Sequence, residues 1–136
     1  MGRILAIDYG IKNCGLAVTD PLQIIANPLK TVKTSSLLNY LEEYWGQEVL
    51  DKIVFGYPTH MDGNPTYVVK EIEDCVKKIR NLNPGILIDY QNENFSSKEA
   101  QEIIMKSGLN RKQRQDKSRL DKISAVIILQ RYLKHI

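Results

Sequence analysis

Three acidic residues stand at the ends of predicted secondary-structure elements. Asp8 follows the apolar run at 4–7, Glu93 comes just after the apolar run at 86–90, and Asp121 opens the last apolar helical segment. A carboxylate beside a core is poorly solvated unless it is paired or holds a cation. Three carboxylates at close range repel one another unless they are protonated or a cation lies among them.

An all-oxygen set of ligands favours Mg²⁺ or Mn²⁺ over zinc. Two such ions about 3.5–4 Å apart can activate a water and stabilise the leaving oxygen in phosphodiester cleavage. We therefore predict that Asp8, Glu93 and Asp121 are catalytic residues that share a site for two divalent ions. The alternative is three separate roles: Asp8 caps a turn, Glu93 is a surface acid, and Asp121 is an N-cap beside its helix dipole.

A basic segment precedes the third acid and suggests a polyanionic partner. The region at 110–120 is polar and lacks periodicity, so a loop is expected there. A cationic loop beside a metal site would neutralise phosphates and give sequence-independent, salt-sensitive affinity, whereas the alternative is a solvated loop without a partner. The cations are Arg111, Lys112, Arg114, Lys117, Arg119 and Lys122.

Other reactive side chains form no recognisable catalytic set. His60 lies in the loop at 59–64 and is interpreted as a bystander, and neither a Ser–His–Asp arrangement nor a phosphate-binding GxxxxGK[ST] loop is found. Cys14 and Cys75 lack CxxC spacing, so we expect packing residues rather than zinc ligands or nucleophiles.

The hydrophobic pattern predicts an α/β fold. Strands are expected at 4–7, 15–18, 28–32, 52–58 and 86–90, and helices at 37–45, 65–82, 96–107 and 123–133. The first three strands should form an antiparallel meander, and Pro28 suits a strand entry or an edge. The later alternation requires crossovers into a mixed sheet with helices on its faces. Asp8 and Glu93 share a rim if the first and last strands are near neighbours.

Length and composition fit a single domain over residues 1–136. The chain is 43% hydrophobic and 26% charged, which is ordinary for a soluble globular protein. No apolar run approaches the roughly 18 residues of a membrane span, and Asp8 interrupts the N-terminal run before it could serve as a signal-peptide core. A cytoplasmic, reduced protein is therefore expected. The net charge of +3 is too small to establish a polyanionic partner by itself.

Four segments carry a resemblance to a known family. DYGIKNCGLAVTD (8–20), VFGYPTHMDG (54–63), NENFSSKEA (92–100) and DKISAVIILQRYL (121–133) resemble the YqgF family of bacterial proteins, described as pre-16S ribosomal RNA nucleases and formerly as Holliday junction resolvases. The resemblance implies a ribonuclease-H-like fold with a mixed five-stranded sheet, in which two parallel strands join the meander. It also implies metal-dependent phosphodiester hydrolysis in 5′-end processing of pre-16S ribosomal RNA, during ribosome biogenesis in the cytoplasm.

The family's acidic positions fall on Asp8, Glu93 and Asp121, and its basic first turn falls on Lys12 as a nucleic-acid contact. The family usually has Lys-Arg in that turn and Asp-Glu-Arg around the second acid. This chain instead has Asn13 after Lys12, and Asn92 and Asn94 on either side of Glu93. Two arginines that could bind phosphate bidentately are thus missing, which lowers the expected affinity for substrate.

Three functions compete on the sequence. The leading one is a nuclease acting on structured RNA, in ribosomal precursor particles, or on branched DNA such as a Holliday junction. The second is a non-catalytic nucleic-acid or ribosome-binding module with a decayed site, which the asparagine replacements suggest. The third is half of a sugar-kinase-like or actin-like nucleotide-binding protein, because residues 8–20 also resemble their first phosphate loop. The chain is too short for the second domain that such a cleft requires.

Overall fold

The computed structural model describes residues 2–57, 68–92 and 117–134, and at 117–122 the description covers the backbone alone. The strands in this part of the chain are β1 (Arg3–Asp8), β2 (Asn13–Thr19), β3 (Ala26–Lys33), β4 (Leu50–Tyr57) and β5 (Leu87–Asn92). The helices are α1 (Leu37–Gln47), α2 (Val68–Leu82) and α5 (Lys117–Tyr132), and a single 3₁₀ turn, η1 (Thr34–Ser36), precedes α1. The helix expected at 96–107 lies outside the described residues.

The five strands form one mixed sheet in the order β3-β2-β1-β4-β5. β1, β2 and β3 pair antiparallel, as the short connections predicted, while β1 with β4 and β4 with β5 pair parallel. The predicted meander plus two parallel strands is confirmed. Because β1, β4 and β5 run in the same direction, their carboxyl ends lie along one edge of the sheet.

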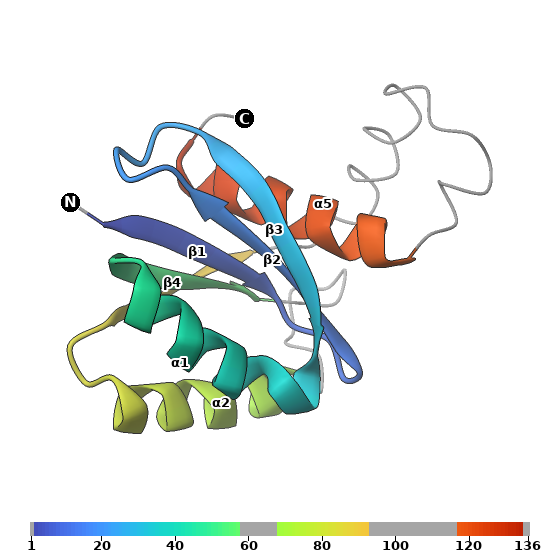
Figure 1. The fold of residues 1–136 in the computed structure, drawn as a ribbon. Coiled ribbons are helices and arrows are strands. Elements are labelled where there is room, and N and C mark those ends of the chain that lie inside the picture. The colour runs from blue at the N-terminus through green and yellow to red at the C-terminus, as the bar shows by residue number, and fades with distance from the viewer. Residues whose placement is uncertain (1, 58–67, 93–116, 135–136) are drawn as a thin grey trace.

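Helices cover both faces of this sheet, giving three layers (Figure 1). The alternation of side chains in β1 sends Leu5 and Ile7 to one face, where they pack in a core with residues of α1 and α2. Ile4 and Ala6 point to the other face, where they pack against Ala125 and Ile128 of α5. The two faces are called the α1/α2 face and the α5 face below.

One local expectation is corrected. The run at 86–90 was expected to be a buried strand, but β5 is an edge strand, and its first residue, Leu87, is 61% exposed because only β4 flanks it. At the start of α1, Ser36 makes no side-chain cap hydrogen bond, and the hydroxyl of Thr34 bonds to the Gly10 carbonyl. Pro28 lies in β3 at the opposite edge of the sheet, as expected.

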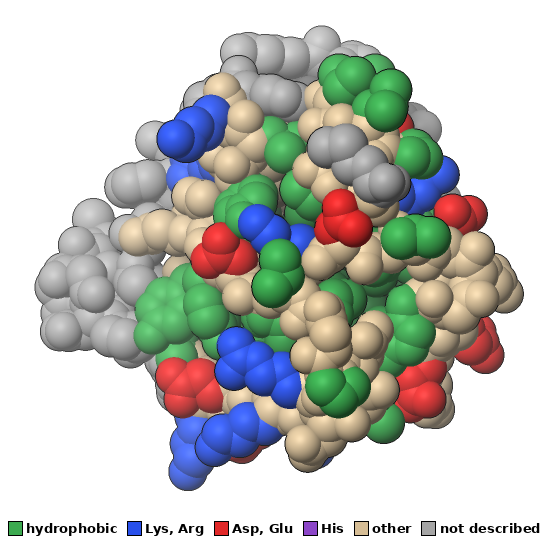
Figure 2. All heavy atoms as spheres, turned by 90° about the vertical axis from the view of Figure 1, so that its left-hand side faces the viewer, with side chains coloured by type: hydrophobic (Ala, Val, Ile, Leu, Met, Phe, Trp, Pro, Cys, Tyr) green, Lys and Arg blue, Asp and Glu red, His purple; other side chains and the backbone are tan. Residues whose placement is uncertain are grey.

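The surface at the amino ends of β1 and β4 carries both exposed apolar and charged side chains. Exposed apolar side chains at this end belong to Leu22, Ile24 and Ile25 of the β2–β3 connection, to Val49 before β4, and to Leu87. Charged side chains interrupt them on the face shown in Figure 2. The described helices include none that is both long and apolar enough to cross a membrane.

Candidate functional site

Asp8 is the last residue of β1 and lies on the α5 face of the sheet. It shares the parity of Ile4 and Ala6, and it is half-buried. Its partner on β2 is Gly15, and Gly56 is the next residue on β4 after Phe55, the partner of Ile7. Both glycines are buried. The carboxylate is therefore flanked on each neighbouring strand by a residue without a side chain, so these two positions place only backbone beside it.

The row that contains Asp8 extends across the whole sheet. Gly15 pairs with Thr31 on β3, and Gly56 pairs with Gln91 on β5. Residues in one row of a sheet place their side chains on the same face. Asp8 thus lies at the centre of a polar row at the carboxyl edge of the parallel strands.

The turn after Asp8 is held closely by its surroundings. A Cβ on Gly10 would lie 2.4 Å from the carbonyl oxygen of Asn13, so this position needs glycine for a close backbone approach. The Thr34 hydroxyl donates a 2.6 Å hydrogen bond to the Gly10 carbonyl, and the Thr34 amide donates to the Lys12 carbonyl at 2.9 Å. The 3₁₀ turn η1 therefore fixes the turn that carries the exposed Lys12.

The other predicted site residues are described less fully. Glu93 lies outside the described residues, directly after Asn92 at the end of β5, and Arg111, Lys112, Arg114, Asn94 and His60 are also outside them. Lys117, Arg119 and Asp121 have a described backbone, and all three lie in α5. Of the three acids, the structure therefore gives a side-chain position for Asp8 alone.

The positions in α5 correct two expectations. Asp121 was expected to open the final helix, but α5 begins at Lys117, so Asp121 is its fifth residue and cannot be its N-cap. A loop was likewise expected up to residue 120, but residues 117–120 belong to α5. The cause is that charged residues such as lysine and arginine are good helix formers, whereas the expected start relied on apolar periodicity alone.

Near the C-terminal end of α5, Tyr132 contacts two residues of the sheet, Asp89 and Lys52, which the sequence did not predict. The Tyr132 hydroxyl donates to Asp89 Oδ2 at 2.8 Å and contacts the ammonium of Lys52, which lies 5.0 Å from the centre of the Tyr132 ring. These contacts lower the pKa of Asp89, chiefly through the Tyr132 hydrogen bond, then through the Tyr90 amide and the charge of Lys52. The network fixes the lengthwise position of α5 over the sheet.

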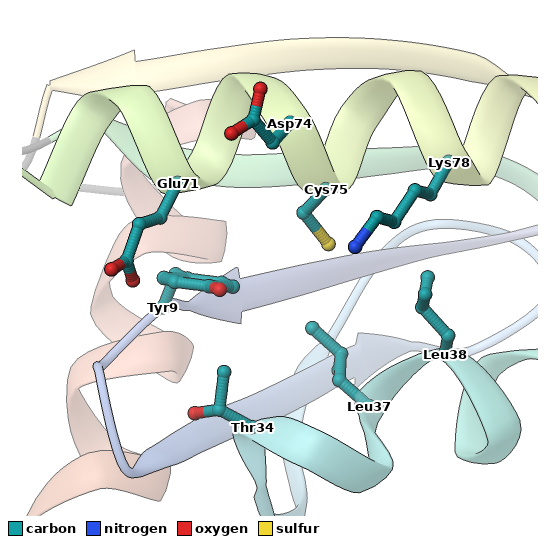
Figure 3. A pocket seen from close by; sticks show the side chains of 8 residues that line it. All are labelled: Tyr9, Thr34, Leu37, Leu38, Glu71, Asp74, Cys75 and Lys78. Atoms are coloured by element: carbon teal, nitrogen blue, oxygen red, sulfur yellow. The ribbon is translucent and has the colours of Figure 1, made fainter.

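A cavity of about 210 Å³ lies on the α1/α2 face beside the turn after β1. Figure 3 shows Glu71, Asp74, Cys75 and Lys78 of α2 on one side of it, with residues of η1 and α1 opposite. Burial, followed by the charges of the two cysteines, Glu71 and Asp74, raises the pKa of Tyr9 there to about 12. Two acids and one lysine make this cavity a poor phosphate site, and it lies across the sheet from Asp8.

The cysteines behave as packing residues. Neither Cys14 nor Cys75 forms a disulfide, and both are buried in the core of the α1/α2 face. Burial and the neighbouring Cys14 raise the pKa of Cys75 to about 11, so its thiol stays protonated at neutral pH and is a poor nucleophile.

The described residues contain no group of three or more potential metal ligands. Asp8 nevertheless offers carboxylate oxygens, the donor type that hard cations prefer, at the carboxyl ends of the parallel strands. The chemistry of this one described acid thus fits a divalent ion.

Comparisons with known proteins agree with this geometry. A family model described as "RuvX: Holliday junction resolvase" matches residues 2–135. A protein of Porphyromonas gingivalis is 45% identical over 133 residues, covering 98% of this chain and 96% of the relative. One of Flavobacterium psychrophilum is 44% identical and covers 98% and 97%. Both are named "Putative pre-16S rRNA nuclease".

The fold also has a solved counterpart. The structure described as T. thermophilus RuvC in complex with Holliday junction substrate matches 98% of this chain and 96% of that chain, with a TM-score of 0.56 and 14% identity. At that identity the match establishes the fold alone, and it confirms the predicted ribonuclease-H-like architecture. The resemblance drawn from the sequence is likewise confirmed: the chain belongs to the RuvX (YqgF) family of nucleases.

Proposed function

We propose that this protein hydrolyses phosphodiester bonds in the precursor of 16S ribosomal RNA, in the cytoplasm, with divalent cations held by Asp8, Glu93 and Asp121. The observation that carries the proposal is the place of Asp8 between Gly15 and Gly56 at the carboxyl edge of the parallel strands. The names of the relatives from Porphyromonas gingivalis and Flavobacterium psychrophilum support the choice of substrate.

Chain connectivity supports Glu93 as the second ligand. β5 ends at Asn92, on the same sheet edge as Asp8, and only β4 separates β5 from β1. Glu93 is the next residue and has the parity of Asp89, whose side chain contacts α5. A carboxylate at this position could reach a cation beside Asp8.

Helical spacing supports Asp121 as the third ligand. Asp121 precedes Ala125 by four residues and Ile128 by seven, a spacing that puts all three on one side of an α-helix. Ala125 and Ile128 pack against the sheet. The N-terminal end of α5 also lies on the same side of the molecule as the carboxyl end of β1 (Figure 1).

The chain's own residues would hold and orient the substrate. Mg²⁺ or Mn²⁺, in one or two ions, supplies activation of a water and neutralisation of the leaving oxygen when bound. Asp8 presents its oxygens from a strand with a hydrogen-bonded neighbour on each side, so its position is well defined. Lys12 in the anchored turn and the basic residues up to Arg119 would bind the phosphates around the cleaved bond.

A second candidate, resolution of branched DNA, is favoured by the description of the matching family model. Both substrates offer phosphodiesters in structured nucleic acid, so the same acids would serve. A binding module without catalysis is the third outcome, because Asn13 and Asn92 stand where the family usually has charged residues.

The test compares precursor 16S ribosomal RNA and a four-way DNA junction, with Mn²⁺, Mg²⁺ or EDTA, for the wild-type protein and Asp8→Asn. We expect Mn²⁺-dependent cleavage of the RNA by the wild type and a loss of about 100-fold or more in Asp8→Asn, the scale of removing a metal ligand or its close support. Cleavage of the junction alone would select the second candidate. Absence of any cleavage, or full activity of Asp8→Asn, would contradict the metal site.

A further inference from the structure

A groove of about 390 Å³ lies where α1 packs beside the exposed edge of the sheet. Its volume is within the roughly 300–1,000 Å³ range of ligand pockets. The lining combines cations, hydrogen-bonding groups, one aromatic ring and a single acid. These residues are Lys30, Thr31, Val32, Lys33, Ser36, Asn39, Tyr40 and Glu43.

The groove contains an aromatic ring, Tyr40, with an exposed cation, Lys30, beside it. The ring of Tyr40 stacks with that of Tyr44, with centroids 6.3 Å apart and 26° between the planes. The ammonium of the exposed Lys30 lies 5.5 Å from the centre of the Tyr40 ring. An exposed cation–π contact is weak, and lysine has a flexible four-carbon stem. The ammonium can therefore leave the ring to pair with a phosphate while a base takes its place.

The groove is lined by residues from both faces of the edge strand β3. In β3, Lys30 pairs with Leu16 of the α1/α2 core, whereas Thr31 pairs with Gly15, the partner of Asp8. By the alternation of a strand, Thr31 lies on the Asp8 side of the sheet and Lys30 on the other. Thr31 is two strands from Asp8 in one row, about 10 Å at the usual strand spacing. A nucleic-acid strand of a few nucleotides could connect the two positions.

Cations mark the path between them. Lys33 pairs with Asn13, the residue after Lys12, and the Lys12 carbonyl accepts the Thr34 amide. Lys12, Lys33 and Lys30 therefore follow one another from the turn after Asp8 to the groove, and among the described residues that line the groove Glu43 is the only acid. Alternating cations and an aromatic ring are the features by which proteins bind single strands through phosphate pairing and base stacking.

We propose that this groove binds an unpaired stretch of the nucleic-acid substrate. One base of that stretch stacks on Tyr40, and the phosphates next to the base pair with Lys30 and Lys33. The inference takes its substrate class, nucleic acid, from the proposed function. It adds a second contact between the protein and that substrate, away from the proposed metal site. Hydroxyl and amide groups of Thr31, Ser36 and Asn39 could bond a 2′-hydroxyl, so RNA should bind better than DNA.

The experiment measures binding without cleavage, by fluorescence anisotropy of labelled U₁₂ and dU₁₂ in EDTA. Tyr40→Leu removes the flat ring and keeps an apolar side chain, and it should weaken U₁₂ binding about tenfold, the scale of one lost stacking contact. Tyr40→Phe keeps the ring and should bind within about twofold of wild type, as should Lys77→Ala, which removes an exposed lysine of α2. Circular dichroism checks that each variant is folded.

Photo-cross-linking locates the base. RNA with 5-iodouridine should cross-link to the tryptic segment 34–52, with the adduct on Tyr40, and unlabelled U₁₂ should compete. Equal affinity of Tyr40→Leu and wild type, absence of U₁₂ binding by wild type, or an adduct elsewhere would each overturn the proposal. Cleavage by the wild type with no effect of Tyr40→Leu would leave the proposed function intact. If RNA binding depends on Tyr40 but no metal supports cleavage, the result would support nucleic-acid binding in the groove and contradict the proposed nuclease activity.

Discussion

Asp8 and Gly15 face each other across the β1–β2 pair, at the end of the strand that lies in the middle of the sheet. Because glycine has no side chain, β2 places only backbone beside the carboxylate at this position. The neighbouring strands hold Asp8 in place through their backbones, and the two glycines put no side chain of their own beside its carboxylate.

The first prediction concerns stabilisation by metal. A ligand that binds only the folded state raises the free energy of unfolding, by about 2.7 kcal/mol at 100 times its dissociation constant. Mn²⁺ should therefore raise the Tm of the wild type, and Asp8→Asn should remove most of that rise without lowering the metal-free Tm. Asp20→Asn is the control, because Asp20 lies in the β2–β3 connection and caps it through the Ile24 and Ile25 amides. An equal rise in Asp8→Asn and wild type would show that the ion binds elsewhere.

The second prediction concerns the tight turn after β1. Gly10→Ala should destabilise the protein by about 1–3 kcal/mol, because its Cβ would meet the Asn13 carbonyl oxygen at 2.4 Å. Gly46→Ala is a matched control within α1, where the new Cβ would have no described atom within 4 Å apart from its chain neighbours and the backbone of its own helix. It should be neutral or stabilise by up to about 1 kcal/mol. Urea denaturation measures both, and an equal response of the two variants would be evidence against the close approach.

The third prediction concerns Thr34, whose hydroxyl binds the Gly10 carbonyl at 2.6 Å. Thr34→Val keeps the shape of the side chain and removes the donor, so the free energy of unfolding should fall by about 1 kcal/mol. Thr34→Ser keeps the hydroxyl and should lose less. Since this contact also positions the turn with Lys12, Thr34→Val should reduce nuclease activity more than Thr34→Ser does. Identical unfolding curves for the two variants would rule out the contribution of this hydrogen bond.

The fourth prediction concerns pH. The Tyr132 hydrogen bond lowers the pKa of Asp89 from its ordinary 3.8, so the folded pKa is below the unfolded one. The resulting stabilisation is present above pH 3.8 and is lost as the pH falls through the folded value. Tyr132→Phe should therefore cost about 1 kcal/mol or less at pH 7, since Asp89 is exposed. The cost should shrink toward pH 3, and in an Asp89→Asn background it should not vary with pH.

The fifth prediction concerns the basic segment. Replacing Lys112, Arg114 and Lys117 with glutamine should weaken binding to RNAs of different sequence by similar factors. It should also reduce the slope of log affinity against log salt by up to about 3, one for each lost phosphate contact. Replacing Lys70, Lys77 and Arg80, exposed on α2, tests whether the effect is local. A loss limited to one RNA sequence would contradict a phosphate-binding role.

The sequence was sufficient where local pattern and chain order decide the structure. Alternating strands and helices predicted the mixed sheet, and the apolar run at 4–7 put Asp8 at the end of a strand. Pro28 was expected at a strand entry or an edge and lies in an edge strand, because its missing N–H removes one ladder hydrogen bond.

Other features depend on register and on distant partners, which no local pattern contains. The row that sets Gly15 and Gly56 beside Asp8 follows from strand pairing. The Tyr132–Asp89 contact joins residues 43 positions apart. The exposure of β5 reflects its place at the edge, although its residues resemble those of a buried strand. The joining of Glu93 and Asp121 with Asp8 stays a prediction.

The edge strand β3 also bears on how molecules of this protein meet one another in concentrated solution. Pro28 offers no N–H, and Lys30 and Lys33 put positive charge on the same strand. Proline and lysine are the devices by which an open edge avoids growing into a sheet shared between chains. The strand should therefore resist aggregation while its side chains remain accessible to a polyanion, so protection from self-association and openness to a nucleic-acid strand come from the same few residues.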